Sequence, residues 1–242
     1  METWRLITTW GTDPAFNMGL DEALLESDES APTLRLYTWR PEALSLGYFQ
    51  RYDEVPAAAR APAVVRRITG GGAIHHSREL TFSIAASIEH PLYRGPVTGS
   101  YERVHEAVAR ALAAFGVPAR PRGAEGLLSD APATGMCFHH STPLDLCWNG
   151  RKGVGSAQRR RAGRVLHHGS IKIGRSPLEG AIASADQHAP GLRAESFAPA
   201  LLEAFRAAFD AVFEAGVPTP TERDRARELG PRYVDPEFVR RR

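Results

Sequence analysis

The chain is poor in cysteine, lacks long hydrophobic runs and carries almost no excess of either charge. Its 242 residues include only two cysteines, Cys137 and Cys147, which excludes a disulfide framework. No run approaches the roughly 20 apolar residues of a membrane-spanning helix, and Met1–Arg5 does not resemble a signal peptide. We therefore expect a cytoplasmic protein, with no membrane association, whose thiols stay reduced and available for chemistry.

The charge balance does not indicate a nucleic-acid partner. The formal net charge is +2, too small to favour a polyanion by itself. Basic residues cluster only at Arg159–Arg161 with Arg164 and at Arg240–Arg242, and most such runs are solvated faces. The first cluster is the only feature that would favour nucleic-acid binding, and we expect no nucleic-acid partner.

Hydrophobic periodicity predicts strands and helices in mixed order. Apolar residues at helical spacing predict helices over 14–27, 100–116 and 197–213, the second with Ser100 as its N-cap. Alternating or β-favouring runs predict strands over 4–8, 33–39, 43–48, 63–68, 80–87, 144–148, 151–158 and 165–173. Asn149-Gly150 predicts a hairpin turn. The pattern indicates an α+β fold, with one mixed or antiparallel sheet packed on helices.

A single large domain accounts for most of the chain. We predict this domain over 1–216 and a charged, proline-punctuated extension over 217–242 that packs on it or trails from it. In the first helix, Asp21 and Glu22 are expected to be solvated or to hold a neighbouring loop. The segment 118–135 has no periodicity, and a loop of that length is usually functional or disordered. Because it leads to Cys137, we favour a functional role.

Three consecutive glycines, Gly70–Gly72, follow an apolar run. Glycine belongs where the chain turns tightly or where a ligand comes close to the backbone. A phosphate-binding loop would need Gly-Lys-Ser/Thr, and a dinucleotide-binding motif would need Gly-x-Gly-x-x-Gly. Ala73-Ile74-His75 follows instead and excludes both motifs. A plain tight turn remains the alternative to a ligand site.

Cys137 precedes Lys152, a lysine flanked by glycines on the strand after the hairpin turn. An ionised cysteine is a strong nucleophile, and a nearby lysine favours that ionisation. Without further information, the residue pattern is also compatible with a buried structural cysteine, which is the commoner role of this residue type. We interpret the glycines, the cysteine and the lysine as parts of one acyl-transfer site.

The stretch Arg66-Arg67-x-Thr69-Gly70-Gly71-Gly72-Ala73-x-x-His76 resembles the signature of the lipoate/octanoate transferase and ligase family, which is related to biotin protein ligases. Further stretches that resemble this family are 17–24, 34–39, 44–50, 150–158 and 168–171. The resemblance implies the α+β fold of the biotin/lipoate ligase catalytic domain. Cys137-Phe138 is similar to the cysteine-dependent octanoyltransferases. The ATP-using ligases typically lack this cysteine and carry an accessory region for which the chain has no room.

The resemblance implies octanoate transfer in protein lipoylation. Octanoyl-acyl carrier protein would donate the acyl group to the Cys137 thiolate, and a lysine of a lipoyl domain would take it as an amide. The lipoyl domain would belong to the glycine cleavage H protein or to the E2 subunit of a 2-oxoacid dehydrogenase. Lys152 would favour the thiolate and donate to the thioester carbonyl. The reaction needs no ATP, cofactor or metal, and we expect a monomer.

Other site residues are also implied by the resemblance. The residues expected to bind substrate are Arg67, Gly70, Gly71, Gly72, His76, Gly155, Ser156, Ala157, Gln158, His168 and Gly169. Three histidine pairs suggest a metal only weakly, because neighbours on a strand point to opposite faces. We expect His76 or His140 to handle a proton during aminolysis, and Cys147 to serve in packing.

Other functions remain open. An amidotransferase would move lipoyl or octanoyl groups between lipoyl domains through the same cysteine, and only the acyl donor distinguishes it. An ATP-dependent lipoate-protein ligase would not need Cys137. A binding module for acyl groups or lipoyl domains would bind without turnover. The basic clusters could steer acidic partners, in which case the rate would fall with salt.

Overall fold

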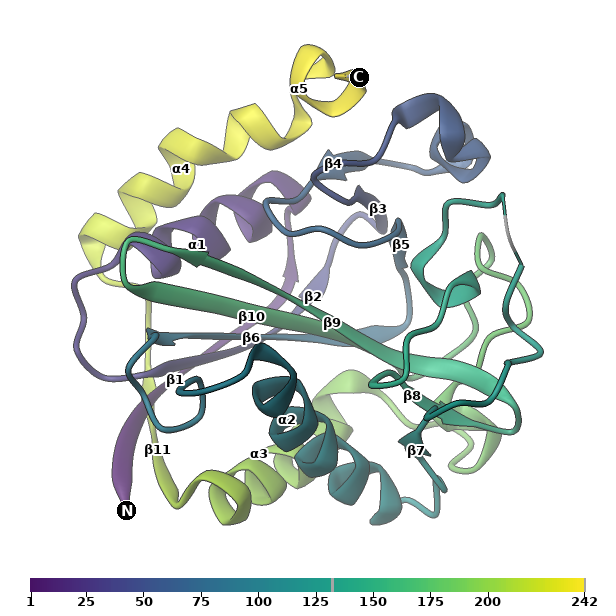
Figure 1. The fold of residues 1–242 in the computed structure, drawn as a ribbon. Helices are drawn as coiled ribbons and strands as arrows, with labels where there is room; N and C mark the ends of the chain where they lie inside the picture. The colour runs from purple at the N-terminus through teal and green to yellow at the C-terminus, as the bar shows by residue number, and fades with distance from the viewer. Residues whose placement is uncertain (132, 242) are drawn as a thin grey trace.

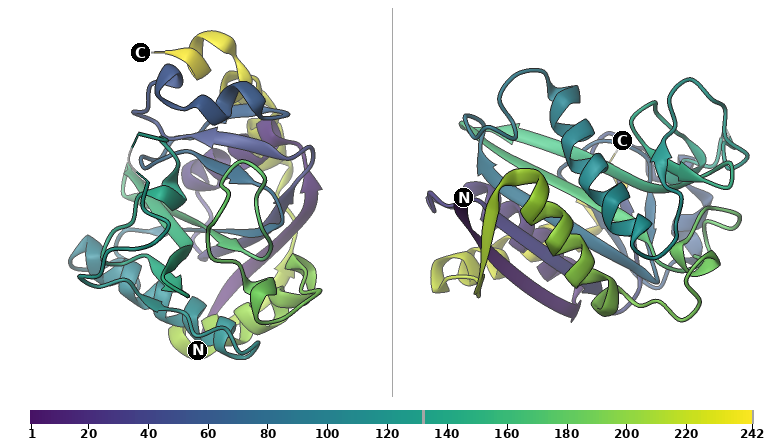
Figure 2. Two further views of the ribbon diagram at one scale, coloured as in Figure 1. Left: turned by 90° about the vertical axis from the view of Figure 1, so that its right-hand side faces the viewer. Right: turned by 90° about the horizontal axis from the view of Figure 1, so that it is seen from below.

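An eight-stranded sheet runs through the middle of the molecule and carries helices on both faces (Figures 1 and 2). The structure is a computed structural model that describes residues 1–131 and 133–241. The order of the large sheet is β11-β1-β2-β6-β10-β9-β8-β7, and a smaller sheet has the order β4-β3-β5. The strands are β1 (Glu2–Thr12), β2 (Thr33–Trp39), β3 (Ala43–Leu46), β4 (Val64–Arg66), β5 (Ile74–His76), β6 (Glu79–Ser87), β7 (Arg120–Pro121), β8 (Leu146–Trp148), β9 (Arg151–Arg161), β10 (Arg164–Lys172) and β11 (Ala211–Gly216). The helices are α1 (Pro14–Glu26), α2 (Val97–Ala113), α3 (Ala194–Phe209), α4 (Pro220–Val234) and α5 (Pro236–Arg240).

The large sheet is mixed, as predicted. Strand β1 pairs in parallel with β2 and β11, whereas β2, β6, β10 and β9 pair antiparallel in succession. The prediction of a single sheet is wrong, because β3, β4 and β5 form their own sheet. Strands of three or four residues show too little alternation to reveal which partner they join. This small sheet carries the glycine stretch on the connection between β4 and β5.

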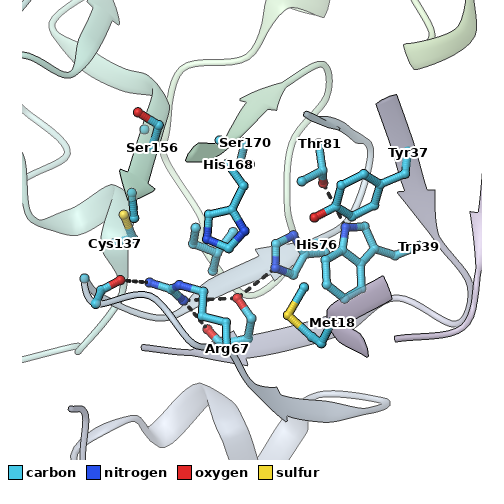
Figure 3. A pocket seen from close by; sticks show the side chains of 17 residues that line it. Met18, Tyr37, Trp39, Arg67, His76, Thr81, Cys137, Ser156, His168 and Ser170 are labelled. Carbon is cyan, nitrogen blue, oxygen red and sulfur yellow. Dashed lines mark hydrogen bonds between the residues drawn. The ribbon is translucent and has the colours of Figure 1, made fainter. Parts of the chain in front are cut away.

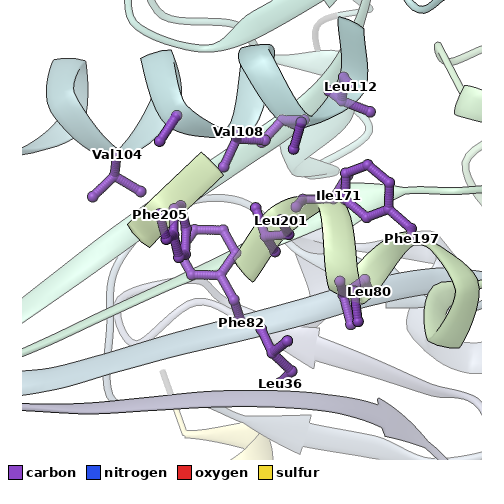
Figure 4. Packing of buried hydrophobic residues seen from close by; sticks show 14 of the residues in the cluster. Leu36, Leu80, Phe82, Val104, Val108, Leu112, Ile171, Phe197, Leu201 and Phe205 are labelled. Atoms are coloured by element: carbon purple, nitrogen blue, oxygen red, sulfur yellow. The ribbon is translucent and has the colours of Figure 1, made fainter. Parts of the chain in front are cut away.

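Helices α2 and α3 cover one face of the large sheet (Figures 1 and 4). Val104, Val108 and Leu112 lie at helical spacing on α2 and are fully buried. They belong to the same apolar cluster as Phe197, Leu201 and Phe205 of α3 and Phe82 of β6, whose side chains Figure 4 shows between the helices and the strands. Burial of this cluster fixes the position of β9 and β10, which carry most of the predicted site residues.

Helices α1 and α4 cover the opposite face (Figure 1). They can pack this closely because Gly19 has no side chain. A Cβ at this position would lie only 2.3 Å from the carbonyl oxygen of Ala226. The prediction for Asp21 and Glu22 is wrong, since both are almost fully buried. Glu22 accepts a hydrogen bond from the hydroxyl of Tyr233 on α4, so it holds the C-terminal helix rather than facing solvent.

The C-terminal segment also contacts the small sheet. The guanidinium of Arg66 donates to the carbonyl oxygens of Phe238 and Val239 on α5. The division into a catalytic domain over 1–216 and an extension over 217–242 remains a proposal, and Arg242 of the basic cluster lies outside the described residues. Among the described residues, no helix combines the length and the apolar character needed to cross a membrane.

The predicted boundaries of two helices are wrong, since α2 spans Val97–Ala113 and α3 spans Ala194–Phe209. Helix α3 ends at Phe209, and the apolar residues after it form β11, which pairs with the edge of β1. Asp210 adopts a left-handed conformation with φ of 49° and ends the helix without the glycine that usually marks such an end. Helix α2 begins at Val97 rather than after Ser100. The sequence did not reveal this start, because the N-cap residue is Pro96, which makes no side-chain capping hydrogen bond. Ser100 instead donates back to the carbonyl oxygen of Val97.

Candidate active site

The glycine stretch and the cysteine segment lie against each other, as the sequence predicted. Ala73 forms a bridge with Met136, and the amide of Cys137 donates to the carbonyl oxygen of Ala73 over 2.7 Å. A Cβ on Gly72 would lie 2.7 Å from the Cys137 nitrogen, closer than real side-chain carbons come. Gly72 is therefore required by the close approach of the cysteine backbone.

Lys152 reaches Cys137 from β9. Its Nζ lies 3.4 Å from Cys137 Sγ and 3.1 Å from the Cys137 carbonyl oxygen. It also forms a 2.8 Å ion pair with Asp145, whose carboxylate accepts from the amide and hydroxyl of Thr142. Burial disfavours the ammonium, but Cys137 and Asp145 outweigh it and raise the pKa of Lys152. Lys152 is therefore charged at neutral pH.

The sequence contains only two lysines, Lys152 and Lys172, and both are buried. Lys172 Nζ lies between two buried carboxylates, 2.7 Å from Glu79 and 2.8 Å from Glu179. It also donates to the carbonyl oxygen of His75. Lys172 is therefore part of the interior, and Lys152 is the lysine beside the cysteine.

Arg67 holds the glycine stretch in place. Its guanidinium donates to the carbonyl oxygens of Gly70 and Gly72 and to the carbonyl and hydroxyl of Ser45 on β3. Nε donates to the hydroxyl of Thr69. With every guanidinium nitrogen engaged inside the protein, the structure places Arg67 as a support for the loop. Its part in substrate binding remains a proposal.

A narrow cavity leads inward from Cys137 (Figure 3). The space between protein atoms here is about 440 Å³, part of it open to solvent, with Cys137 at one side and Trp39 at the opposite side of Figure 3. Its lining residues are Met18, Tyr37, Trp39, Ser45, Arg67, Gly70, Gly71, Ile74, His76, Thr81, Cys137, Gly155, Ser156, Ala157, His168, Gly169 and Ser170. Aromatic rings, aliphatic groups and glycine backbone dominate this wall, which suits an apolar ligand.

Trp39 and His76 form the inner end of this cavity. Their rings stack with centroids 3.9 Å apart. Trp39 Nε1 donates to Thr81, and His76 lies between Glu79 at Nδ1 and Ser45 at Nε2. Burial lowers the pKa of His76 to about 4, even though Glu79 opposes the shift. Because both ring nitrogens are hydrogen-bonded, His76 is held in place as a neutral residue of the cavity wall. The structure gives no support to its predicted role in proton transfer.

Polar groups behind the cavity are fully paired. Asp21 on α1 accepts from Arg35 and Tyr37 of β2 and is bonded to His168 of β10. The other ring nitrogen of His168 lies 2.6 Å from the hydroxyl of Thr69, next to the glycines. Burial disfavours the Asp21 carboxylate, but His168 and Arg35 outweigh it and lower the pKa of Asp21. This network joins the glycine stretch to the large sheet.

The predicted residues on β9 and β10 divide into two groups. Gly155, Ser156, Ala157, His168 and Gly169 line the cavity. Gln158 does not, because its amide is bonded to Ser100 and His167 on the far side of the strand. Their roles as substrate-binding residues remain proposals.

An open cleft meets the cavity at Cys137. Gly71, Cys137 and Ser156 line both, while Asp145 and Lys152 line only the cleft. His140, exposed at its surface, lines the cleft as well. Among the residues that the structure describes, no group of three histidine, cysteine or acidic side chains is placed to hold a metal ion. Cys137 thus lies where the narrow cavity joins the wider cleft.

Sequence reasoning missed several residues of this site. Asp145 has no motif around it, and Trp39 belongs to a predicted strand and to a stretch of the family resemblance without being assigned to the site. Met18 and Tyr37 were noted only as parts of the family resemblance. No local signal distinguishes these residues, because periodicity gives no order of strands and therefore does not show which elements lie beside the glycines.

The buried histidine predicts a loss of stability in acid. His76 binds a proton near pH 6.5 when unfolded and near pH 4 when folded. Between these values the unfolded state holds more protons, so the free energy of unfolding falls as pH falls, by up to about 3 kcal/mol from this residue. Urea unfolding at pH 7, 5.5 and 4 measures this slope. In His76→Gln, the number of protons taken up on unfolding in this pH range should be smaller by close to one. A slope of unfolding free energy against pH that equals that of wild type would contradict the lowered pKa of His76.

The fold and the paired cysteine and lysine at the end of an apolar cavity define a class of acyl-handling enzyme. The family described as "Lipoyl protein ligase A/B catalytic domain" matches residues 13–189, and the chain belongs to this family. The chain is 37% identical to octanoyltransferase LipM of Kyrpidia tusciae, over 98% of each protein. It is 41% identical to octanoyltransferase LipM of Moorella thermoacetica, over 71% of this chain and 66% of that protein.

Two solved structures share the fold. Lipoate-protein ligase A bound with ATP matches with a TM-score of 0.80 at 23% identity, covering 99% of both chains. A bi-partite lipoate protein ligase from Thermoplasma acidophilum matches with a TM-score of 0.76 at 22% identity, covering 99% of this chain and 96% of that one. The predicted family and α+β fold are confirmed. The names of the sequence relatives agree with the predicted acyltransferase and with octanoyl transfer in lipoylation.

Proposed function

We propose that the chain transfers octanoate from acyl carrier protein to a lysine of a lipoyl domain through a thioester on Cys137. One observation carries the proposal: Cys137 Sγ lies 3.4 Å from the charged Lys152, where the apolar cavity opens into the cleft. The cavity suits an alkyl chain, and the cleft leaves room for the arm of a partner protein. The relatives named octanoyltransferase support the same reaction.

In the first step, the Cys137 thiolate attacks the carbonyl carbon of the octanoyl thioester. The new carbon–sulfur bond forms, the donor's carbon–sulfur bond breaks, and the donor leaves as a thiolate. Lys152 stabilises the negative charge that develops on the carbonyl oxygen, and Asp145 keeps its ammonium in place. Because one thioester replaces another, no ATP is consumed.

In the second step, the ε-amine of the acceptor lysine attacks the acyl-enzyme from the cleft. A carbon–nitrogen bond forms, the bond to Cys137 Sγ breaks, and one proton leaves the nitrogen. The amide is more stable than the thioester, so the step runs forward. Lys152 then faces the restored thiolate.

Purified enzyme supplied with three alternative donors tests this function. Transfer to a lipoyl domain from octanoyl-acyl carrier protein without ATP is expected. Transfer only from an octanoylated lipoyl domain would make the enzyme an amidotransferase. Transfer only from free octanoate with ATP would make it a ligase. Binding without any transfer would leave a binding module.

Partner choice and assembly belong to the same proposal. Members of this family modify lipoyl proteins, and we propose lipoyl domains of the glycine cleavage H protein or of an E2 subunit as acceptors. We propose a monomer in the cytoplasm. Arg159 and Arg241 lie over the ring of Tyr48, at 5.4 and 3.8 Å, and would attract an acidic partner. Turnover that is indifferent to salt would contradict such steering.

Trp39 is expected to set the chain length. Replacing its indole by a methyl group in Trp39→Ala would lengthen the cavity beyond the His76 stack. Four further methylenes of a dodecanoyl chain would then be buried, worth about 3 kcal/mol or a preference shift of about 100-fold. Competition between octanoyl and dodecanoyl donors measures the ratio.

Trp39→Phe is the matched control and should shift the ratio much less. Thermal melting must accompany both variants, since removing a buried tryptophan costs about 3–5 kcal/mol. Loss of octanoyl transfer without a gain in dodecanoyl transfer, in a folded variant, would show that Trp39 is not the end wall.

A further inference from the structure

Three side chains at the wall of the cleft and directly behind it take no part in the steps above. His105 on α2, Ser156 on β9 and His167 on β10 form a chain in which Ser156 Oγ lies 2.7 Å from His105 Nε2 and 2.9 Å from His167 Nε2. Both histidines are buried, whereas Ser156 is partly exposed at the junction of cavity and cleft. The hydroxyl is thus the point at which this chain meets substrate.

The fixed partners determine the direction of each hydrogen bond. His105 Nδ1 lies 2.6 Å from the carbonyl oxygen of Leu144, which only accepts, so Nδ1 carries the hydrogen. In the neutral ring, His105 Nε2 is then free of hydrogen. At the other end, Gln158 Oε1 accepts from Arg160, which turns the amide nitrogen toward His167 Nδ1. His167 Nδ1 is therefore an acceptor, and its Nε2 donates to Ser156.

The hydroxyl hydrogen of Ser156 accordingly points at His105 Nε2. The two hydrogen bonds therefore point in the same direction: His167 donates to Ser156, and Ser156 donates to His105. Burial lowers the pKa of His105, with Asp145 opposing the shift and Lys152 adding to it. Burial also lowers that of His167, with further contributions from His105, His168 and Arg160. Tyr101 packs against both rings and is itself neutral. A neutral imidazole at the end of such a chain is a base.

The second step of the proposed function needs a base in this place. Lys152 already carries its proton and cannot take another. Asp145 is occupied by Lys152 and Thr142. His76 lies at the inner end of the cavity with both nitrogens bonded. Of the described residues that line both the cavity and the cleft, Ser156 is the one with a hydroxyl group, and this hydroxyl is bonded to an unprotonated nitrogen in the interior.

We propose that His105 receives, through Ser156, the proton that the acceptor amine loses when it attacks the Cys137 thioester. The amine nitrogen gives its proton to Ser156 Oγ while the Ser156 hydroxyl proton passes to His105 Nε2. The carbon–nitrogen bond forms, the carbon–sulfur bond breaks to return the thiolate, and His105 becomes an imidazolium. This inference rests on the proposed function. It assigns Ser156 to the reacting groups and His105 as a residue that acts through it.

Separating the two steps tests the inference. Enzyme is first loaded with octanoyl-acyl carrier protein and its acyl-enzyme followed by mass, and then mixed with a lipoyl domain in a single turnover. His105→Gln can accept the Ser156 hydrogen bond but cannot take a proton. It is expected to load at the wild-type rate and to transfer about 100-fold more slowly. Ser156→Ala is expected to slow transfer by a similar factor, and His188→Gln, which changes a histidine beside Asn149, is expected to match wild type in both steps.

The pH dependence gives a second measurement. In wild type, the transfer rate should fall in acid more steeply than protonation of the acceptor amine alone requires, because His105 also becomes protonated, and this additional fall should be missing from the slow transfer of His105→Gln. Equal slowing of loading and transfer would mark His105 as structural and overturn the inference. So would full transfer by a folded His105→Gln. If wild-type enzyme forms no acyl-enzyme at all, the proposed function fails and the inference fails with it.

Discussion

Replacement of Cys137 by alanine is expected to abolish acyl-enzyme formation and to lower octanoyl transfer by at least about 10³-fold. The reason is that Cys137 Sγ supplies the only thiol at the junction of cavity and cleft in the part of the chain that the structure describes. Intact-protein mass spectrometry after mixing with octanoyl-acyl carrier protein, without ATP, should show one octanoyl addition on wild type and none on Cys137→Ala.

Cys147 provides the matched control. It is buried in β8, and burial raises the pKa of its thiol, which keeps it unreactive. Cys147→Ala should therefore retain both the mass addition and the transfer, apart from a modest loss of stability. An octanoyl addition that persists on Cys137→Ala would contradict the proposed nucleophile. Unimpaired transfer by Cys137→Ala with ATP and free octanoate would indicate a ligase.

Lys152→Met is expected to lower the rate of acyl loading by about 10² to 10³-fold. The variant removes the ammonium that lies 3.4 Å from Cys137 Sγ and the donor that would face the thioester carbonyl. Methionine keeps the length of the buried side chain, so the loss reports charge rather than volume. Stopped-flow loading at saturating octanoyl-acyl carrier protein measures this rate directly.

Asp145→Asn separates the charge of Lys152 from its position. Asparagine retains acceptors for Thr142 and a hydrogen bond to Lys152, but it removes the partner charge that supports the buried ammonium. A smaller loss of about tenfold is expected, restricted to loading. The double variant should be no slower than Lys152→Met alone, because Asp145 acts through Lys152. Additive losses would mean that the carboxylate contacts substrate separately.

The sequence contained enough information for the local parts of this fold. The Asn149-Gly150 turn was predicted from its residue types, and both residues adopt the positive φ values that such a turn requires. The proximity of Gly72 to Cys137 followed from the family resemblance, not from spacing. The roles assigned to these residues remain predictions.

The parts that sequence did not reveal depend on strand order. Asp21 pairs with Arg35, fourteen positions away, and with His168 on β10. Nothing in the local pattern of α1 distinguishes this buried acid from a solvated one. The same holds for His105, whose helix was predicted but whose neighbours on β9 and β10 become visible only when the sheet is assembled. Long-range pairing therefore limited the prediction more than element type did.

The scarcity of lysine has a consequence for an enzyme that makes lysine amides. Of 30 basic side chains of the arginine and lysine types, only Lys152 and Lys172 carry a primary amine, and both are enclosed and ion-paired. An activated thioester on Cys137 therefore meets a surface of guanidinium groups, which do not accept acyl groups under these conditions. The remaining primary amine is the α-amino group of Met1, which is paired with Asp210, so the protein offers few amines of its own to compete with the partner for the acyl group.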